Sequence, residues 1–363
     1  MKLAWKELKH SKIKYLLIES IIILMIFMVI FLSGLANGLA RAVSASIENA
    51  DAAYFVISND AENMIGLSSL SKEVLQQVST MTSDNVTNLN IQRTNLNTYG
   101  DETKLDVTYF AIDPDDFLLP YISEGKAISN TDAEYTIVLD ASFQDENIAV
   151  GDVVEDSAAG IQMTVVGFTD DEMYGHSPVG FISMDTYMLI NTEMNPAFTE
   201  KYNAIAIQGS DIDNITIEGA SVFDKAIIVD NIPGYLEEQL TINMILWVLV
   251  VVSAAILGVF FYVITIQKLK QFGILKAIGM GMRELSSMIT SQVLILALFG
   301  VITGNILAFG MASMLPNSMP FHLEIPMVIV ISVAFIIITL ITSLLSIIKV
   351  AKVDPIVIIG GNE

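Results

Sequence analysis

The chain has 363 residues, of which 53% are hydrophobic, a mean hydropathy of +0.59 and a formal net charge of −22. An ordinary soluble domain is not both this apolar and this acidic, so we expect the two properties in different parts of the chain. Residues 42–238 hold 6 Lys+Arg and 34 Asp+Glu, a net charge of −28, whereas the remaining residues hold 12 and 6, a net charge of +6. Since there is no cysteine, disulfide bridges and thiol nucleophiles are excluded.

Four apolar stretches have the length of membrane spans: residues 15–37, 241–264, 288–310 and 327–348. Each is close to the ~20 residues that a helix needs to cross the hydrocarbon core of a bilayer. The first stretch also resembles a secretory signal, because LANGLA at its end (residues 35–40) is faintly like a cleavage site. Its apolar part exceeds the ~7–15 residues of a signal peptide, and three more spans follow, so a retained span is favoured.

Basic residues flank the spans on one predicted side of the membrane. Lysines precede the first span, four cations lie between the second and third, and two lysines follow the fourth (Lys2, Lys6, Lys9, Lys12 and Lys14; Lys268, Lys270, Lys276 and Arg283; Lys349 and Lys352). By the positive-inside rule, these segments and both termini are cytoplasmic, and the chain is a multi-pass protein of the cell membrane. The acidic segment and the loop 316–324 are then outside, and only Arg41 disagrees with this topology.

These patterns predict an integral membrane α-helical protein with four transmembrane helices and a large α+β extracytoplasmic domain between helices 1 and 2. The predicted divisions are a cytoplasmic N-terminus with the first helix, the acidic domain, the second helix, a cytoplasmic coupling segment, and the last two helices with the cytoplasmic C-terminus (1–41, 42–238, 239–265, 266–286 and 287–363). The sequence contains no internal repeat and no low-complexity linker.

The acidic domain is predicted to mix strands and helices. Residues 135–140, 163–168 and 203–209 are short β-branched runs that end in turn signals, as strands do. Residues 71–81 have the apolar spacing of a helix, with Ser71 as the expected N-cap. Because no disulfide supports this domain, its own core must hold it together.

Motifs of catalysis and metal binding are missing from the sequence. There is no G-x-x-x-x-G-K-[ST] motif, so the chain has no P-loop for a nucleotide. Its three histidines, His10, His176 and His322, are scattered, and the predicted topology separates the first from the other two. Two acidic clusters, at 113–116 and 170–172, are suited to a hard cation, but solvated turns are favoured. We therefore predict no catalytic residue, no metal site and no permanently bound cofactor.

Small residues in the spans predict close helix packing, because lipid supplies no hydrophobic force between helices. Gly34 and Gly38 form a GxxxG motif at the outer end of the first span. Gly300 and Gly304 form a second motif in the third span. Both motifs are compatible with dimerisation and with packing inside one chain.

Three side chains of the first span are candidates for function. Glu19 lies about one turn inside the cytoplasmic end, where an acidic group is costly and often functional. A pairing with Lys12, or a reach to the lipid headgroups, is the favoured interpretation. Met25 and Met28 lie one turn apart on a shared face. Thioethers usually fill a core or face lipid, and they are also ligands of haem iron.

The basic segment QKLKQFGILKAIGMGMREL, residues 267–285, lies between the second and third spans. On a helical wheel, five apolar residues share a face opposite two cations (Ile274, Leu275, Ile278, Met282 and Leu285; Lys276 and Arg283). Gly279 and Gly281 weaken a continuous helix, which predicts a bent or two-part amphipathic segment. Such a helix lies on the inner membrane surface or docks into a groove of a soluble partner.

The stretch FGILKAIGM, residues 272–280, resembles the signature that follows the second span in FtsX-like (MacB-type) ABC transporter permeases. One span, a large outside domain and three further spans is also the arrangement of that family. The resemblance implies that this segment contacts a separate ATPase subunit, which binds the ATP (Phe272, Gly273, Ile274, Leu275, Lys276, Ala277, Ile278 and Gly279). It further implies a non-enzymatic type VII ABC subunit that works as a homodimer with two ATPase copies, with membrane lipids and without nucleic acid as partners.

Several other stretches are similar to the hemin-efflux branch of that family (MKLAWKELKHSKIKYLLI, SGLANGLAR, DEMYGHS, FFYVITIQKLKQFGILKAIG, SMPFHL and KVDPIVIIGG). This resemblance implies an ATP-driven pump that removes haem from the membrane. Met25 and Met28 then become candidate axial ligands of the haem cargo, and Tyr174 and His176 are candidates for a later site outside. A structural turn is the other interpretation of the MYGHS stretch.

Two other functions stay open at this point. A permease of the same architecture could move a peptide or a lipid-linked cargo, and an FtsX-type regulator could drive cell-wall hydrolases or signalling without transport. The acidic outside domain favours release of haem over its capture, because the field of the domain repels the haem propionates.

Overall fold

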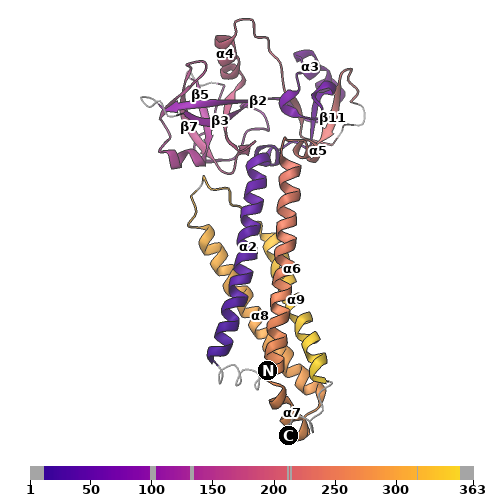
Figure 1. Cartoon of the computed structure of the whole chain (residues 1–363). Helices are drawn as coiled ribbons and strands as arrows, with labels where there is room; N and C mark the ends of the chain where they lie inside the picture. The colour runs from indigo at the N-terminus through magenta and orange to yellow at the C-terminus, as the bar shows by residue number, and fades with distance from the viewer. Residues whose placement is uncertain are drawn as a thin grey trace. The chain divides into compact units, whose positions relative to one another are not determined.

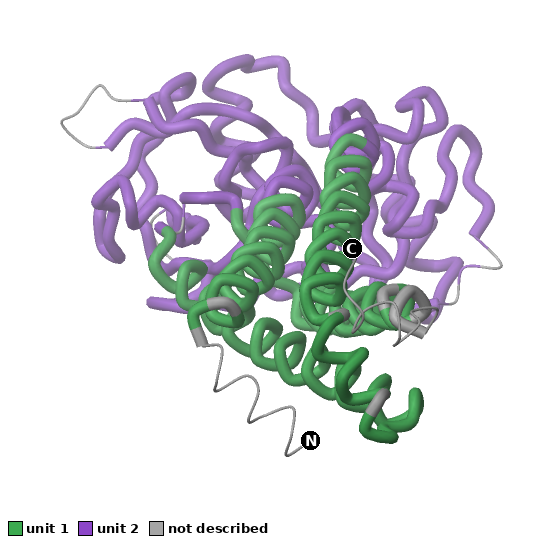
Figure 2. The backbone as a smooth tube through the Cα atoms, turned by 60° about the horizontal axis from the view of Figure 1, so that its bottom comes forward, with its two compact units in different colours: residues 1–37, 241–315, 321–363 green, residues 38–240, 316–320 purple. Residues whose placement is uncertain are grey.

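The structure is a computed structural model that describes residues 12–98, 104–130, 135–210, 212, 215–316 and 318–351. The chain divides into two compact units, coloured separately in Figure 2. The helical unit comprises residues 1–37, 241–315 and 321–363, and the α+β unit comprises residues 38–240 and 316–320. The predictions for the lysines before Lys12 and for the C-terminal stretch KVDPIVIIGG lie outside the described residues.

Four long helices carry the apolar stretches (Figure 1). They are α2 (Lys12–Asn49), α6 (Tyr235–Gln267), α8 (Met282–Ala312) and α9 (Ile325–Ala351). The parts that are long and apolar enough to cross a membrane are Tyr15–Asn49, Tyr235–Gln267, Met282–Ala312 and Ile325–Leu345. By length and composition, the prediction of four membrane-spanning helices is therefore confirmed.

Two of these helices extend beyond the predicted divisions of the chain. α2 continues to Asn49, past the boundary expected at residue 41, because residues 42–49 contain neither Gly nor Pro to stop it. α6 begins at Tyr235, ahead of the boundary expected at residue 239. Gly234, directly before it, has a φ of +89°, a conformation that favours glycine, and this turn defines the start of the helix.

The glycines of α8 let this helix approach α2 closely within one chain. A Cβ atom at Gly300 would lie 2.5 Å from Ile22 Cγ2, and one at Gly304 would lie 2.8 Å from Ile26 Cγ2. Both isoleucines are buried in the core of the helical unit. These contacts correspond to packing inside the chain, one of the two interpretations of the second GxxxG motif.

Gly34, from the first GxxxG motif, receives a different neighbour. A Cβ atom at this position would lie 2.6 Å from Cζ of Phe321, in the segment before α9. The carbonyl oxygen of Gly34 also accepts a hydrogen bond from His322 N at 2.9 Å. The absence of a side chain at Gly34 thus makes room for the segment that leads into α9.

The segment between α6 and α8 is a short helix followed by a sharp turn. α7 (Leu269–Ala277) ends before Ile278, and Gly279 has a φ of +99°, which residues with a side chain rarely adopt. α8 then begins at Met282, and the Glu284 carboxylate accepts a hydrogen bond from Gly281 N at 3.3 Å. The prediction of a two-part segment is confirmed.

The five apolar residues that share a face on the helical wheel have different environments in the structure. Leu285 is buried in the core of the helical unit, and Leu275 and Met282 pack against that core. Ile274 and Ile278 are instead 50% and 75% exposed in the chain. The turn at Gly279 separates α7 from α8, so a single helical wheel does not describe both, and before the turn Leu275 packs against the core while Ile274 and Ile278 do not.

The α+β unit is built on a mixed sheet of eleven strands among its described residues. The strand order is β11-β1-β10-β2-β3-β9-β5-β7-β4, with β6 beside β2 and β7, and β8 beside β9. The pairs β3·β9 and β5·β7 are parallel, and the other pairs are antiparallel. The bounds are β1 Tyr54–Ser58, β2 Val86–Thr98, β3 Lys104–Ile112, β4 Ile122–Gly125, β5 Thr136–Asp140, β6 Val153–Asp156, β7 Gln162–Thr169, β8 Met173–Tyr174, β9 Ser177–Ser183, β10 Ala204–Ile207 and β11 Ala220–Asp224.

The predicted elements of this unit are present. The three predicted strands correspond to β5, β7 and β10, and the predicted helix is α3 (Lys72–Met81). Ser71 does occupy the N-cap position of α3, but its side chain makes no capping hydrogen bond to the backbone. Two further helices, α4 (Met184–Met194) and α5 (Lys225–Asp230), complete the unit. Together with the four long helices, they confirm the predicted fold class of four spans and a large α+β domain between the first and the second.

Candidate functional site

The predicted coupling segment presents two apolar side chains and anchors itself by others. Phe272 and Gly273 of α7 are buried, and Phe272 belongs to the core of the helical unit. Ile274 and Ile278 are exposed, as given above, and we call these two residues the α7 surface. Lys276 lies in the last turn of α7, where a cation is favourable at the negative end of the helix dipole.

A buried lysine joins this segment to two of the long helices. Lys268 occupies the N-cap position of α7, and its Nζ donates hydrogen bonds to the Tyr15 hydroxyl of α2 and, at 3.2 Å, to Gln292 Oε1 of α8. The same ammonium lies 5.1 Å from the centroid of the Tyr15 ring. A buried ammonium must be hydrogen-bonded to offset its lost hydration. These contacts therefore fix the start of α7 relative to α2 and α8.

Sequence reasoning missed this role of Lys268, because it treated all the cations of the segment as topology signals. One signal was available in the sequence. Gln292 is a polar residue inside an apolar span, and such residues usually have a partner in the bundle.

Glu19 of α2 is buried next to Gly300 of α8. A Cβ atom at Gly300 would lie 3.2 Å from Glu19 Oε1. Neither carboxylate oxygen of Glu19 has a hydrogen-bond partner among the described residues. The side chain of the partner expected for it, Lys12, lies outside the described part of the chain.

The candidate thioether ligands have different surroundings. Met25 is partly buried and packs against the core of the helical unit. Met28 is among the exposed apolar residues of α2. In a single chain, only Met28 is therefore open to a ligand that approaches from lipid.

Tyr174 and His176 belong to a tight hairpin between β8 and β9. Tyr174 pairs with Ser177, and the two residues between them, Gly175 and His176, have φ values of +57° and +63°, which is the type I′ pattern of two-residue hairpins. The backbone N–H groups of both turn residues donate to carbonyl oxygens of α2. Gly175 N lies 2.9 Å from Val43 O, and His176 N lies 2.8 Å from Ala42 O. The stretch thus forms a tight turn that is anchored to α2 through its backbone.

The two side chains of this hairpin have different environments. The Tyr174 ring packs edge to face against Phe110 at 5.6 Å, and burial raises the pKa of its hydroxyl to about 12. The His176 imidazole is exposed, and its Nε2 lies 2.8 Å from Glu238 Oε1. A ligand bound by both side chains would have to displace Tyr174 from its apolar contacts.

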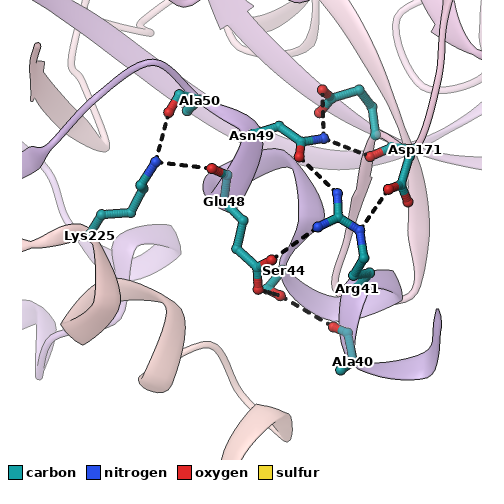
Figure 3. A network of polar contacts seen from close by, with 9 residues as sticks. Ala40, Arg41, Ser44, Glu48, Asn49, Ala50, Asp171 and Lys225 are labelled. Carbon is teal, nitrogen blue, oxygen red and sulfur yellow. Dashed lines mark hydrogen bonds and ion pairs between the residues drawn. The ribbon is translucent and has the colours of Figure 1, made fainter. Parts of the chain in front are cut away.

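A network of polar contacts at the end of α2 explains the one charge that disagreed with the topology (Figure 3). Arg41 Nε donates to Asp171 Oδ2 at 2.6 Å, Nη1 donates to Glu48 Oε2 at 3.2 Å, and Nη2 donates to Asn49 Oδ1 at 2.8 Å. Lys225 Nζ donates to the carbonyl oxygens of Glu48 and Ala50, at 2.9 Å each. Arg41 thus has a structural role within the α+β unit, where it joins the end of α2 to the segment before β8.

The acidic cluster 170–172 is not the solvated turn that we favoured. Asp170 is exposed and Asp171 is paired with Arg41, but Glu172 is only 5% exposed. Asn49 Nδ2 donates to Glu172 Oε1 at 3.1 Å, and Glu172 N donates to Asp140 Oδ2 at 2.8 Å. Burial is the main cause that raises the pKa of Glu172 from 4.5 to about 7.

No metal centre is formed by this cluster or elsewhere in the described ranges, where no group of three or more His, Cys, Asp or Glu side chains could hold an ion. The other acidic cluster is bridged by an amide, since Asn130 Nδ2 donates to Asp113 Oδ1 at 3.0 Å and to Asp115 Oδ2 at 3.1 Å. Its carboxylates are therefore held as a turn.

Two family models match the chain. The model described as FtsX-like permease C-terminal matches residues 243–355. The model described as MacB-like periplasmic core domain matches residues 16–226. The first match contains α7 and the last two long helices, and the second contains most of α2 and most of the α+β unit.

Curated relatives match over the whole chain. Proteins provisionally named hemin transport system permease protein HrtB are 30% identical in Staphylococcus haemolyticus and 31% identical in Staphylococcus epidermidis, over 100% of both chains in each case. An uncharacterized ABC transporter permease of Mycobacterium tuberculosis is 26% identical over 67% of this chain and 66% of its own length. Among solved structures, the extracellular domain of the ABC-type transporter YknZ from Gram-positive bacteria is 13% identical, with a TM-score of 0.34, over 48% of this chain and 99% of that chain.

Proposed function

The chain belongs to the FtsX-like permeases, which makes it an ABC transporter permease, and on that premise we propose that it is the membrane subunit of an ATP-driven exporter of haem. The observation that carries this proposal is the identity of 30–31% over the full length to permeases named for hemin transport. Haem is flat and largely apolar and partitions into lipid, so a permease can take it directly from the membrane. The cargo moves outward, towards the side of the acidic α+β unit.

The ATP is bound by a separate ATPase subunit that docks on the α7 surface. Ile274 and Ile278 are apolar and exposed, and an apolar pair beside cations suits a groove on a soluble partner. Phe272 is buried in the core of the helical unit, so a force on α7 passes into the bundle. Two ATPase copies act on a homodimer of the permease, with the termini and α7 on the cytoplasmic side of the cell membrane.

The haem pathway begins at the exposed side of α2. Met28 provides a thioether there, and Met25 follows one turn earlier, closer to the core. His176 of the β8–β9 hairpin is exposed and is the next candidate ligand, since its imidazole is able to bind haem iron after it leaves Glu238. Tyr174 joins this site only after a rearrangement that brings its hydroxyl out of the apolar packing.

The cargo proposal is tested by titrating the purified full chain with hemin and recording the absorbance of the haem. We expect a haem band that Met28→Leu weakens and that Met244→Leu, a matched change at an exposed methionine of α6, leaves unchanged. Tyr174→Phe and His176→Asn are suitable variants for the later site, because the first keeps the ring and the second tolerates a positive φ. Cells that lack the gene should also become sensitive to hemin.

Absence of a haem band together with unchanged hemin sensitivity would contradict haem export. A defect in cell-wall cleavage in the same cells would then favour the regulator, and a defect in peptide or lipid-linked export would favour the other cargo. Either outcome leaves membership in the permease family untouched.

The ATPase docking surface is tested separately. Ile274→Asp combined with Ile278→Asp should abolish co-purification of the ATPase subunit and export together, because two charges are then buried at the contact. Leu67→Asp adds a charge at an exposed apolar residue of the α+β unit and serves as the control. Leu275 is unsuitable for this test, because it packs against the helical core. Survival of both co-purification and export would refute the assignment.

A further inference from the structure

The α+β unit contains a cavity of about 210 Å³ that the transport proposal does not use. It is lined by the end of α2, by the strands β2, β3, β7 and β9, and by residues 117–121, which precede β4. This volume is below the roughly 300–1,000 Å³ of pockets that enclose drug-sized ligands. An occupant of this cavity is therefore small.

Two buried polar side chains line the cavity with atoms that lack a hydrogen bond of good geometry. Glu172 is 5% exposed and Ser46 of α2 is 3% exposed. Glu172 Oε2 and Ser46 Oγ each lack a hydrogen bond of good geometry among the described residues, and the Ser46 side chain lies close enough to the Glu172 carboxylate to act against the burial that raises its pKa. Leaving such groups unsatisfied is unfavourable, and more so for a charged group, unless a ligand or water completes them.

The charged side chains that line the cavity itself all have one sign. Asp51, Asp170 and Glu172 line it, and the residues that line it include no lysine, arginine or histidine. Two cations lie just outside the lining. Arg41 is engaged with Asp171, Glu48 and the lining residue Asn49, and Lys225 donates to the carbonyl oxygens of Glu48 and of the lining residue Ala50. An electrostatic field of this sign attracts a cation and repels the propionates of haem.

Apart from Asn49 and Thr169, the remaining walls are mostly apolar and aromatic. Phe110, Phe117 and Phe181 line the cavity together with leucine and isoleucine side chains. A metal ion prefers a cage of several oxygen ligands, but the described residues supply no group of three metal-binding side chains. Aromatic faces beside a carboxylate are instead the setting in which substituted ammonium ions bind, through cation–π contacts and the loss of apolar surface.

We propose that this cavity is a binding site for a small organic cation, a substituted ammonium whose charge pairs with the Glu172 carboxylate and whose alkyl groups contact the phenylalanine rings. The Ser46 hydroxyl donates a hydrogen bond to a polar substituent of the ligand or accepts one from it. The site does not depend on the identity of the transported cargo. Because Ser46 and Asn49 of α2 and Glu172 after β7 all line the cavity, an occupant connects α2 with the sheet inside the α+β unit.

The test is calorimetric titration of the purified full chain with choline and with its neutral counterpart of the same shape, 3,3-dimethylbutan-1-ol. We expect choline to bind. The neutral alcohol should bind at least about tenfold more weakly, because it lacks the positive charge that is attracted to the Glu172 carboxylate. Glu172→Gln should weaken choline binding by a similar factor. Glu146→Gln removes one carboxylate at an exposed position that does not line the cavity, and choline binding should be unchanged.

Four outcomes would overturn the proposal. They are no choline binding at millimolar concentration, equal binding of the neutral alcohol, unchanged binding in Glu172→Gln, and complete displacement of choline by Ca²⁺ at an equal concentration. If Glu172→Gln fails to fold, Asp170→Asn replaces it, because Asp170 is exposed at the cavity and its loss should weaken choline binding without affecting the fold. A supporting result is choline binding that weakens in either variant and persists in Glu146→Gln.

Discussion

The Arg41 guanidinium donates to the Asp171 carboxylate at 2.6 Å, although the two residues are 130 positions apart in the chain. The contact ties the end of α2 to the segment before the β8–β9 hairpin. It is reinforced by Asn49, whose Nδ2 donates to the carbonyl oxygen of Asp171 at 2.9 Å. A basic residue beyond the predicted outer end of the first span is therefore explained by local pairing.

Arg41→Gln should destabilise the α+β unit by about 1–3 kcal/mol, because Asp171 and Glu48 lose a charged donor that is largely buried. The measurement is thermal unfolding of the purified chain, together with proteolysis at the end of α2. Arg93→Gln is the control, since the ion pair of Arg93 with Asp106 is exposed and worth at most about 1 kcal/mol. Equal effects of the two substitutions would contradict the structural role of Arg41.

Gly300→Ala should destabilise the helical unit by about 1–3 kcal/mol, because the new Cβ would lie 2.5 Å from Ile22 Cγ2 in a close-packed contact. Gly310→Ala in the same helix meets nothing within 4 Å and should be neutral or slightly stabilising, because alanine favours helix over glycine. Thermal unfolding of the two variants in the same detergent measures the difference. Equal stability would argue against close packing of α2 on α8 within the chain.

Lys268→Met should lower the stability of the helical unit by about 1–3 kcal/mol and should reduce export for each ATP hydrolysed. The substitution keeps an unbranched side chain, one atom shorter, and removes the donor to Tyr15 and Gln292, so the start of α7 is less well held. Lys270→Met, at an exposed position of α7, is the matched control. Export and ATP hydrolysis are measured on the reconstituted permease with its ATPase. A larger loss in the Lys270 variant would contradict the positioning role of Lys268.

The stability of the α+β unit should fall as the pH rises from about 4.5 to about 7, because burial raises the pKa of Glu172 to about 7. A raised carboxyl pKa means that the folded state binds more protons than the unfolded state in this window. The contribution of Glu172 to the free energy of unfolding is complete at a pH below 4.5, its pKa in the unfolded chain. That contribution is lost as the pH rises through about 7, its pKa in the folded chain. The total is of the order of 3 kcal/mol, and Asp140, whose pKa is also raised by burial, acts in the same direction.

Proteolysis of the full chain across this pH range measures the effect, and Glu172→Gln should remove most of the slope. Glu146→Gln, at an exposed carboxylate, should leave the slope in place. A slope that survives in Glu172→Gln would assign the titration to another group.

The sequence determined the features that depend on composition and local spacing. Four apolar stretches of sufficient length predict four spans, because a helix in lipid must satisfy its own backbone and cover it with apolar side chains. The stretch FGILKAIGM identified the permease family, and the glycine at 279 predicted the break after α7, since both signals lie within a few residues. The strands β5, β7 and β10 were likewise predicted from short β-branched runs.

Only the tertiary structure decided how neighbours in the sequence differ in environment. Asp170, Asp171 and Glu172 are adjacent carboxylates, yet one is exposed, one is paired with Arg41 and one is buried at a cavity. Lys268 and Lys270 are equally basic, yet only Lys268 is buried, against Tyr15 and Gln292. These differences arise from residues far apart in the chain, and no local pattern records which distant side chains will supply a partner or remove water.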